Sequence, residues 1–244
     1  MTDTSPLLVS RAQGWATLAM NQPERRNAMT AAMMDALADA LQALSADASV
    51  AAIVLRGEGG AFSSGVDLTE LQQSAGDGPA AARRFQTSLR RAHMALYHCA
   101  CPIVVALERY GINGSTALAL AGDVLVAGEG AFLQIGEIQQ GVGIPMNAAW
   151  MRLRHGEAVL ARMAFLGDRV PAPELHRLGV VQELVADDQV RARAEAIAQR
   201  IASFPAGASR AIKIDVRRQQ RIDPETWFAN QRDSTLHAAA QVRG

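Results

Sequence analysis

The sequence contains little cysteine and no residue pattern typical of a metal site. Cys99 and Cys101 are the only cysteines among 244 residues. Two residues so close together in a strand-like stretch are poorly placed to form a disulfide, and no second cysteine pair completes a zinc ligand set. The five histidines show no shared spacing with carboxylates or cysteines that would suggest a bound metal ion. We therefore expect two reduced thiols and no metal centre.

Long apolar runs and an excess of charge are also missing. No apolar stretch approaches the roughly 18 residues that a membrane-spanning helix needs, and residues 1–10 lack the basic and apolar regions of a signal peptide. Acidic and basic residues balance at 24 each, which argues against a partner such as nucleic acid or a membrane surface. The sequence therefore predicts a cytoplasmic protein that binds neither nucleic acid nor membrane.

The chain has enough apolar content and length for a substantial core. Its 244 residues are 49% hydrophobic, which suits one α/β domain or a core with a small appendage. Strands are expected over 7–10, 15–20, 51–55 and 103–107. Residues 30–44 have apolar side chains at helical spacing, with Thr30 as a plausible N-cap. This alternation of strands and helices predicts a mainly parallel sheet.

The second half of the chain is predicted to be mostly helical. Residues 71–80, which include Ser74, Gly76, Gly78 and Pro79, read as a flexible loop. A helix over 81–100, a helix that begins at residue 115 and short strands at 124–127 and 131–133 follow. Further helices are expected over 147–155, 157–166, 172–178, 188–204, 206–220 and 223–242. We divide the chain into a core of residues 1–189 and a helical C-terminal region of residues 190–244.

Two turns that contain glycine are the most informative segments. Residues 61–68 follow the strand at 51–55, residues 110–115 follow the strand at 103–107, and each turn runs into a helical pattern. The first amides of a helix have no partner within the helix, so two such turns can aim free N–H groups at one point. A pair of such donors is what a thioester carbonyl needs when it becomes an enolate. Taken singly, Gly65 and Gly114 could equally be turn glycines that supply positive φ or close packing.

Four segments, in order, resemble the crotonase (enoyl-CoA hydratase/isomerase) superfamily, and the resemblance covers nearly the whole chain. Residues 21–28 resemble the loop along the CoA ribose and phosphates, 61–68 and 111–123 the two oxyanion blocks, and 134–138 the segment with a catalytic glutamate. The resemblance implies an α/β fold with a spiral core of ββα turns and a helical C-terminal trimerisation region. It also implies a homotrimer or a dimer of trimers that acts on an acyl-CoA thioester in fatty acid metabolism. Coenzyme A is then part of the substrate, and no other cofactor is implied.

The resemblance assigns roles to individual residues. The amides of Val66 and Gly114 are expected to be the two oxyanion donors. The residues expected to bind CoA or the remainder of the substrate are Arg25, Ala28, Ser64, Gly65, Asp67 and Leu68. An arginine offers bidentate contacts to phosphate, although Arg25 could also be a solvated surface charge. Asp67 could instead serve the N-terminus of a helix, where a carboxylate meets the helix dipole.

Glu137 is the expected acid/base. It lies between Ile135 and Ile138, just after a strand, in a segment that is apolar for a surface charge. Desolvation by apolar neighbours raises the pKa of a carboxyl group, which suits the group to exchanging protons near neutral pH. The alternative is an exposed loop glutamate without a catalytic role. Two further candidates are Lys213, for a CoA phosphate of a neighbouring subunit, and Phe228, for the acyl chain.

The residues around Glu137 indicate which reaction to expect. Hydratases of the resembled family have a second glutamate three residues after the second oxyanion glycine, and here that position is Ala117. Glu137, Gly141 and Pro145 show a spacing similar to that of the monofunctional Δ3-Δ2-enoyl-CoA isomerases. One base can take a proton from C2 of a 3-enoyl thioester and return it to C4, so isomerisation needs no second carboxylate. The alternatives are an enoyl-CoA hydratase, another crotonase-type lyase or decarboxylase, and a catalytically silent acyl-CoA binder.

Overall fold

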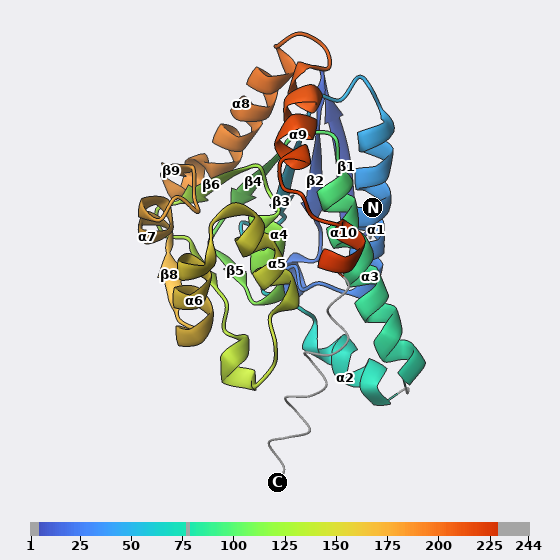
Figure 1. Ribbon diagram of the computed structural model, residues 1–244, viewed down its shortest axis with the longest axis vertical. Coiled ribbons are helices and arrows are strands. Elements are labelled where there is room, and N and C mark those ends of the chain that lie inside the picture. Colours follow the sequence, from blue (N-terminus) through green and yellow to red (C-terminus); the bar gives the residue numbers. More distant parts are fainter. Residues whose placement is uncertain (1–4, 77–78, 229–244) are drawn as a thin grey trace.

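A computed structural model of the chain describes residues 5–76 and 79–228, without the side chains of residues 73–82. The main sheet has six strands in the order β1-β2-β3-β4-β6-β9 (Figure 1). Their bounds are β1 Leu7–Ala12, β2 Trp15–Met20, β3 Ala52–Gly57, β4 Ile103–Leu107, β6 Val124–Gly128 and β9 Glu183–Val185. Only the β1–β2 pair is antiparallel within this sheet, so the predicted, mainly parallel sheet is confirmed.

Each face of the main sheet is covered by different helices. Val54, Val104 and Val126 point to one face, where they form a small core with the side chains of α8 (Val190–Ala202). Ile53 and Leu55, which flank Val54 in β3, point to the other face and belong to the main core. That core includes the apolar stripe of α1 (Ala31–Ala46), and α1 packs on α3 (Pro79–His98). Alternation of side chains along the strands therefore produces two separate apolar layers.

A second, smaller sheet and several helices lie beside the main sheet. This sheet has the order β5-β7-β8, with bounds β5 Tyr110–Ile112, β7 Phe132–Gln134 and β8 Arg169–Pro171. The helices of this part are α4 (Gly114–Leu120), α5 (Pro145–Arg154), α6 (Glu157–Leu166) and α7 (Ala172–Arg177). Short 3-10 segments occur at η1 (Pro23–Arg25), η2 (Glu137–Gln140) and η3 (Asp187–Gln189). The α4 and α5 helices pack on each other at the centre of the view in Figure 1.

The prediction of a flexible loop over residues 71–80 is wrong for most of this segment. Residues Leu68–Gly76 form α2, and α3 begins at Pro79; residues 77–78 of the predicted loop lie outside the described residues. The Asp67 carboxylate accepts a hydrogen bond from the Glu70 amide (2.9 Å) and so caps α2. The Glu70 carboxylate in turn accepts one from the Ala31 amide (3.0 Å) at the start of α1. These capping contacts outweigh the weak helix propensity of the small residues.

The C-terminal segment consists of α8, α9 (Ala208–Arg218) and α10 (Pro224–Trp227). The Arg210 guanidinium on α9 donates to the carbonyl of Ser45 (2.7 Å) near the end of α1 and to that of Val50 (2.8 Å) in the loop that follows. The helix predicted over 223–242 is present as α10, and its part beyond residue 228 lies outside the described residues. The division of the chain at residue 190 stays a prediction.

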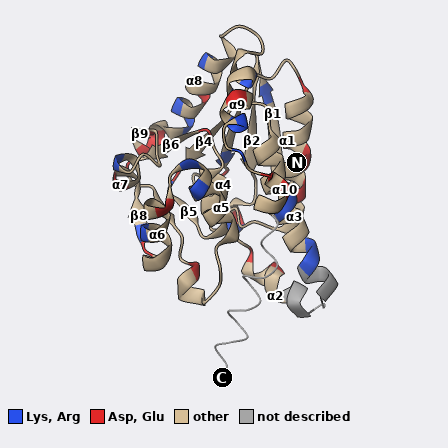
Figure 2. Ribbon diagram, in the orientation of Figure 1, with Lys and Arg blue, Asp and Glu red and all other residues tan. Residues whose placement is uncertain are grey.

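Charges of both signs are spread over the described elements. Blue and red segments are interspersed in the view of Figure 2, in keeping with the balanced composition. Among the helices of the described residues, none is both long enough and apolar enough to cross a membrane.

Candidate active site

The two glycine-bearing turns lie against each other. The Ser63 amide donates to the Tyr110 carbonyl (3.2 Å), and the Ile112 amide donates to the Ser63 carbonyl (3.3 Å). Gly65 has a φ of 97°, and a Cβ atom at this position would lie 2.6 Å from the Ile112 carbonyl oxygen. This approach is too close for any side chain, so glycine is required where the first turn crosses the second.

Val66 and Gly114, the two predicted oxyanion donors, are brought together by this crossing. The Met29 amide donates to the Gly65 carbonyl (2.8 Å), and the Met29 carbonyl accepts from the Asp67 amide (3.0 Å). Because these bonds use the residues that flank Val66, the Val66 N–H itself points away from Met29. Gly114 is the first residue of α4, where an amide has no acceptor within the helix. A Cβ atom on Gly114 would lie 3.2 Å from a Val66 methyl group.

The Ser115 side chain links the two turns through hydrogen bonds. Its hydroxyl group accepts a hydrogen bond from the Ile112 amide (2.8 Å) and lies 2.8 Å from the Ser63 carbonyl, to which it can donate. The side chain is fully buried. Ser115 therefore supplies a polar cross-link between the two turns.

Glu137 is a buried carboxyl group at the start of η2. Its side chain is 8% exposed. Oε1 accepts a hydrogen bond from the Asn147 side-chain amide (3.0 Å), and Oε2 receives none from any described residue. Burial raises the pKa of Glu137 to about 7, and the hydrogen bonds from its own backbone amide and from Asn147 only partly offset this effect. A carboxyl group in this state exchanges protons readily at neutral pH.

Two asparagines connect Glu137 to the second turn. Asn113 has a φ of 54°, and its side-chain oxygen accepts a hydrogen bond from the Gly136 amide (2.9 Å), directly before Glu137. The Asn147 side-chain nitrogen, which donates to Glu137, also donates to the Asn113 carbonyl (3.1 Å). That carbonyl belongs to the same peptide unit as the Gly114 amide. The carboxyl group and the second candidate donor are thus held in one hydrogen-bond network.

Asn147 is a site residue that sequence reasoning missed. It stands between Met146 and Ala148 on α5, and its side chain is 1% exposed. A polar residue inside an otherwise apolar helix start was the available signal, because a buried amide needs polar partners. The partners Glu137 and Asn113 are 10 and 34 residues away in the chain, so spacing alone could not reveal them.

The predicted CoA-binding residues lie in two adjoining segments, residues 25–28 and 64–68. Ser64 and Gly65 lie at the crossing of the turns, and the Ser64 amide donates to the Arg26 carbonyl (3.0 Å). Arg25 forms an ion pair with Asp67, which is buried and also caps α2. Asp67 therefore caps a helix, which is the role that the sequence offered as the alternative to CoA binding.

The remaining members of this set are Ala28 and Leu68. Ala28 is 8% exposed, and its amide donates to the Arg25 carbonyl (3.0 Å). Leu68 is 55% exposed at the start of α2. The loop at 25–28 and the block at 64–68 thus adjoin each other, and the assignment of these residues to CoA binding stays a prediction.

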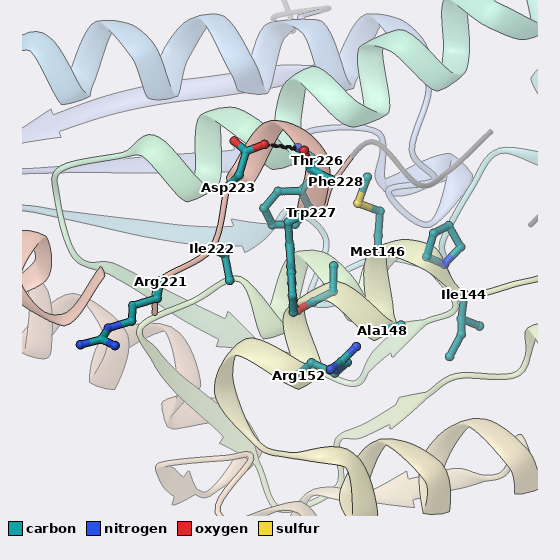
Figure 3. Close-up of a pocket in the computed structure, with 12 residues that line it drawn as sticks. Ile144, Met146, Ala148, Arg152, Arg221, Ile222, Asp223, Thr226, Trp227 and Phe228 are labelled. Carbon is teal, nitrogen blue, oxygen red and sulfur yellow. Dashed lines mark hydrogen bonds between the residues drawn. The ribbon is translucent and has the colours of Figure 1, made fainter. Parts of the chain in front are cut away.

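A cavity of about 620 Å³ lies between α5 and the segment that leads into α10 (Figure 3). Met146, Arg152, Trp227 and Phe228 are among its lining residues. The Trp227 ring nitrogen donates to the Ala149 carbonyl (3.2 Å), which fixes one wall. Phe228 therefore does border a cavity. The lining residues that are described do not include Glu137, Val66 or Gly114, so this cavity is separate from the network around Glu137.

Lys213 is not available to a CoA phosphate. Its side chain is 5% exposed, and its amino group donates to the Cys101 carbonyl (2.7 Å) and to the Asp123 carboxylate (2.7 Å). Cys99 and Cys101 are free and buried. Within the residues that the structure describes, His, Cys, Asp and Glu form no group of three that could hold a metal ion.

Comparison with known proteins identifies the family that this fold and site define. The family model for enoyl-CoA hydratase/isomerase matches residues 10–242. The chain belongs to the enoyl-CoA hydratase/isomerase family of acyl-CoA enzymes, which confirms the crotonase resemblance.

Individual relatives extend over most of the chain. The 2,3-dehydroadipyl-CoA hydratase of Escherichia coli is 29% identical over 242 residues, 98% of this chain and 92% of that protein. A Rhodobacter capsulatus protein named "Probable enoyl-CoA hydratase" is 32% identical over 211 residues, 83% of this chain and 77% of that protein. The crystal structure of an enoyl-CoA hydratase/isomerase from Xanthobacter autotrophicus Py2 is 30% identical, with a TM-score of 0.85 over 97% of this chain and 91% of that chain. The predicted crotonase-like fold is therefore confirmed.

Proposed function

We propose that this protein converts 3-enoyl-CoA thioesters into 2-enoyl-CoA thioesters through an enolate. In this proposal the Val66 and Gly114 amides bind the thioester oxygen, and Glu137 is the single acid/base. Coenzyme A enters as part of the substrate, and the reaction invokes no further cofactor. The loop and block that contain Arg25, Ala28, Ser64, Gly65, Asp67 and Leu68 would border the CoA moiety, as the sequence resemblance implies.

The observation that supports this proposal most is the state of Glu137. A carboxyl group that is buried, has a pKa near 7 and shares a hydrogen-bond network with the Asn113–Gly114 peptide unit is suited to move protons next to a developing enolate. A structural glutamate would normally be paired with a cation. Glu137 has only the neutral amide of Asn147 as a side-chain partner within the described chain.

The proposed reaction needs one proton to cross three carbon atoms. The Glu137 carboxylate takes a proton from C2, and the electrons of that C–H bond pass into the dienolate, whose oxygen accepts the two amide hydrogen bonds. The same proton then returns from Glu137 to C4, and the double bond moves into conjugation with the thioester. Stabilisation of the oxyanion by fixed amides is worth about 3–4 kcal/mol for each donor in other acyl-transfer enzymes.

Hydration of a 2-enoyl-CoA is the second candidate. Two of the similar proteins are named as hydratases, and one of these names specifies 2,3-dehydroadipyl-CoA. Decarboxylation and other lyase reactions of the same scaffold remain further alternatives, because they would use the same enolate. A silent acyl-CoA binder would need Glu137 only as a structural residue.

The test is an isomerase assay with a short 3-enoyl-CoA, followed through the absorbance of the conjugated thioester. Loss of a general base typically costs a factor of 10² or more, so Glu137→Gln should lower turnover at least about a hundredfold. Glu129→Gln changes an exposed glutamate of the β6–β7 turn and should have no effect. A Glu137→Gln protein that keeps most of its activity would remove Glu137 from the mechanism, and tight acyl-CoA binding without any turnover would favour the silent binder.

A further inference from the structure

Cys99 and Cys101 lie in the connection between α3 and β4 and not within a strand. The Cys99 thiol is 3.5 Å from the Cys101 carbonyl oxygen, so its side chain is directed toward residue 101. The Cys101 thiol packs against the loop after α1, 3.3 Å from the Val50 carbonyl oxygen, and a hydrogen bond joins it to the Cys99 thiol. Both cysteines are free and buried. The connection therefore carries two reduced thiols in contact.

A cavity of about 480 Å³ between α1, α3 and α10 has Cys99 in its wall (Figure 1). Apolar side chains from α1 and α3 and polar side chains from all three helices line it, among them Leu41, Met94, Gln42, Arg91, His98 and Glu225. Cys99 is 3% exposed, whereas Cys101 is 0% exposed and is not among the described residues that line the cavity. The cavity thus gives a reagent of about the size of water access to Cys99 and not to Cys101.

The two thiols differ in their electrostatic surroundings. The Lys213 amino group donates to the Cys101 carbonyl (2.7 Å), the same oxygen that the Cys99 thiol contacts, so a cation lies near the Cys99 sulfur. The hydrogen bond from the Cys101 thiol and the charge of Lys213 lower the pKa of Cys99 to about 7, against the opposing effects of burial and of the Asp123 carboxylate. The same hydrogen bond and burial raise the pKa of Cys101. Because the thiolate is the reactive form, Cys99 is the nucleophile of the pair.

We propose that Cys99 and Cys101 form a site of reversible oxidation, at which hydrogen peroxide converts the two thiols into a disulfide. The Cys99 thiolate attacks one oxygen of the peroxide, the O–O bond breaks and hydroxide leaves, which produces a sulfenic acid. The Cys101 sulfur then bonds to the Cys99 sulfur, and the S–O bond breaks as the hydroxyl group leaves with the Cys101 proton as water. In total, one peroxide and two thiols yield one disulfide and two water molecules. The proposal is independent of the proposed function, because Glu137 takes no part in it.

The test is oxidation of the reduced, folded protein by hydrogen peroxide at pH ~7, stopped with catalase. Both cysteines lie between Arg91 and Arg109, so trypsin releases them in one peptide. Mass spectrometry should find this peptide lighter by two hydrogen atoms and unreactive toward iodoacetamide, and dithiothreitol should restore two thiols that can be alkylated. Protein unfolded in urea has thiols of ordinary pKa, so it should form the disulfide at least about tenfold more slowly.

Two variants separate the roles of the thiols. In Cys101→Ala the Cys99 thiolate has no partner thiol, so the first oxidation product should be a sulfenic acid that dimedone labels. In Cys99→Ala the remaining thiol is enclosed and protonated, so it should react at least about tenfold more slowly than Cys99 does in the wild type. Thermal melting shows whether each variant is folded.

Three results with the wild type would contradict the proposal. Faster oxidation of the unfolded than of the folded protein would show that the cavity gives no access to Cys99. A sulfinic acid at Cys99 beside a free Cys101 thiol would show that the two sulfurs cannot pair. A disulfide between two chains, seen by gel electrophoresis without reductant, would also overturn the proposal. These comparisons need no variant, so they decide the question even if neither substituted protein folds.

Discussion

The Glu137 carboxyl group is the residue on which the chemistry depends. Its burial favours the protonated form, and the hydrogen bonds from its own backbone amide and from Asn147 favour the ionised form. The first effect is the larger, so the pKa lies at about 7 instead of the ordinary value of 4.5. At neutral pH the group is present in both forms, which is what a residue needs when it must take a proton and then return it.

This balance predicts a pH dependence of the isomerase reaction. The base form is the ionised carboxylate, which disappears as the pH falls below the pKa of about 7. We therefore expect kcat/KM to rise with pH and to level off above pH ~7, when it is measured at constant ionic strength. The Glu129→Gln control should show the same curve as the wild type. A flat profile between pH ~5.5 and pH ~8.5 would mean that another group is the base.

At the scale of elements, the site is made by the crossing of two turns. Each turn comes from its own strand-to-helix connection, and their backbone hydrogen bonds join residues about 50 positions apart, such as Ser63 and Ile112. The crossing leaves no space for a side chain at Gly65. The relative position of the Val66 and Gly114 amides therefore depends on this crossing.

A comparison of two alanine variants tests this dependence. Gly65 (φ 97°) and Gly60 (φ 71°) both have a backbone conformation that favours glycine, but only Gly65 faces another backbone segment, with the Ile112 oxygen 2.6 Å from the position of an added Cβ. Gly60→Ala should cost about 1–2 kcal/mol for the conformation alone. Gly65→Ala should cost clearly more and should also lower kcat. Equal melting temperatures and equal activities of the two variants would show that the turns do not need close contact.

At the scale of the whole molecule, a cluster around Asp123 joins α9 to the core. The Asp123 carboxylate accepts hydrogen bonds from the Ile103 amide (2.8 Å), Lys213 (2.7 Å) and Arg154 (3.1 Å), and Arg217 lies 3.8 Å away. Burial by itself would raise the pKa of Asp123, but the surrounding cations lower it to about 2. One carboxylate thus compensates three cations in the interior.

Removal of this carboxylate should destabilise the entire fold. Asp123→Asn leaves buried cations without their counter-charge, which costs about 3–5 kcal/mol. Asp215→Asn changes a carboxylate of α9 that is 76% exposed, and should have almost no effect. Chemical denaturation at pH ~7 measures both variants. Because the folded pKa of about 2 is below the ordinary 3.8, the contribution of Asp123 is complete above pH ~4 and is lost as the pH falls toward pH ~2.

The outer surface of α9 leads to a prediction about assembly. Ile212 is 65% exposed and Val216 is 58% exposed, one helical turn apart. Apolar side chains on one exposed stripe favour contact with another chain, in keeping with the homotrimer or dimer of trimers that the family resemblance implies. We expect the double variant Ile212→Glu/Val216→Glu to sediment as a smaller species than the wild type. The control is Arg218→Glu, which lies off this stripe and should not change the mass. A wild-type monomer would contradict the prediction.

The sequence predicted the strands, the two crossing turns and the acid/base candidate, because each depends on local pattern. Ile103–Leu107 is a strand since every side chain in it is apolar, and Gly65 and Gly114 mark turns through their lack of a side chain. The burial of Glu137 was also anticipated, although Ile138, one of the two residues that suggested it, is 48% exposed. Its burial therefore comes from the tertiary structure and not from that neighbour.

Features that depend on distant partners were not predictable in this way. Lys213 was a candidate for a CoA phosphate, yet it is buried while its neighbours Ile212 and Ile214 on α9 are exposed. The reason is Asp123, a counter-charge 90 residues earlier in the chain. Asn147 was not predicted as a site residue for the same physical reason, because its partners Glu137 and Asn113 belong to other segments of the fold.

The buried position of Lys213 has a practical consequence for chemical modification. Lys213 is the only lysine of the chain, and its amino group is enclosed and occupied by Asp123. An amine-reactive dye applied to the folded protein should consequently leave the Lys213 side chain unlabelled. Slow labelling of Lys213 would then report the rate at which α9 detaches from the core. Mass spectrometry would measure this rate.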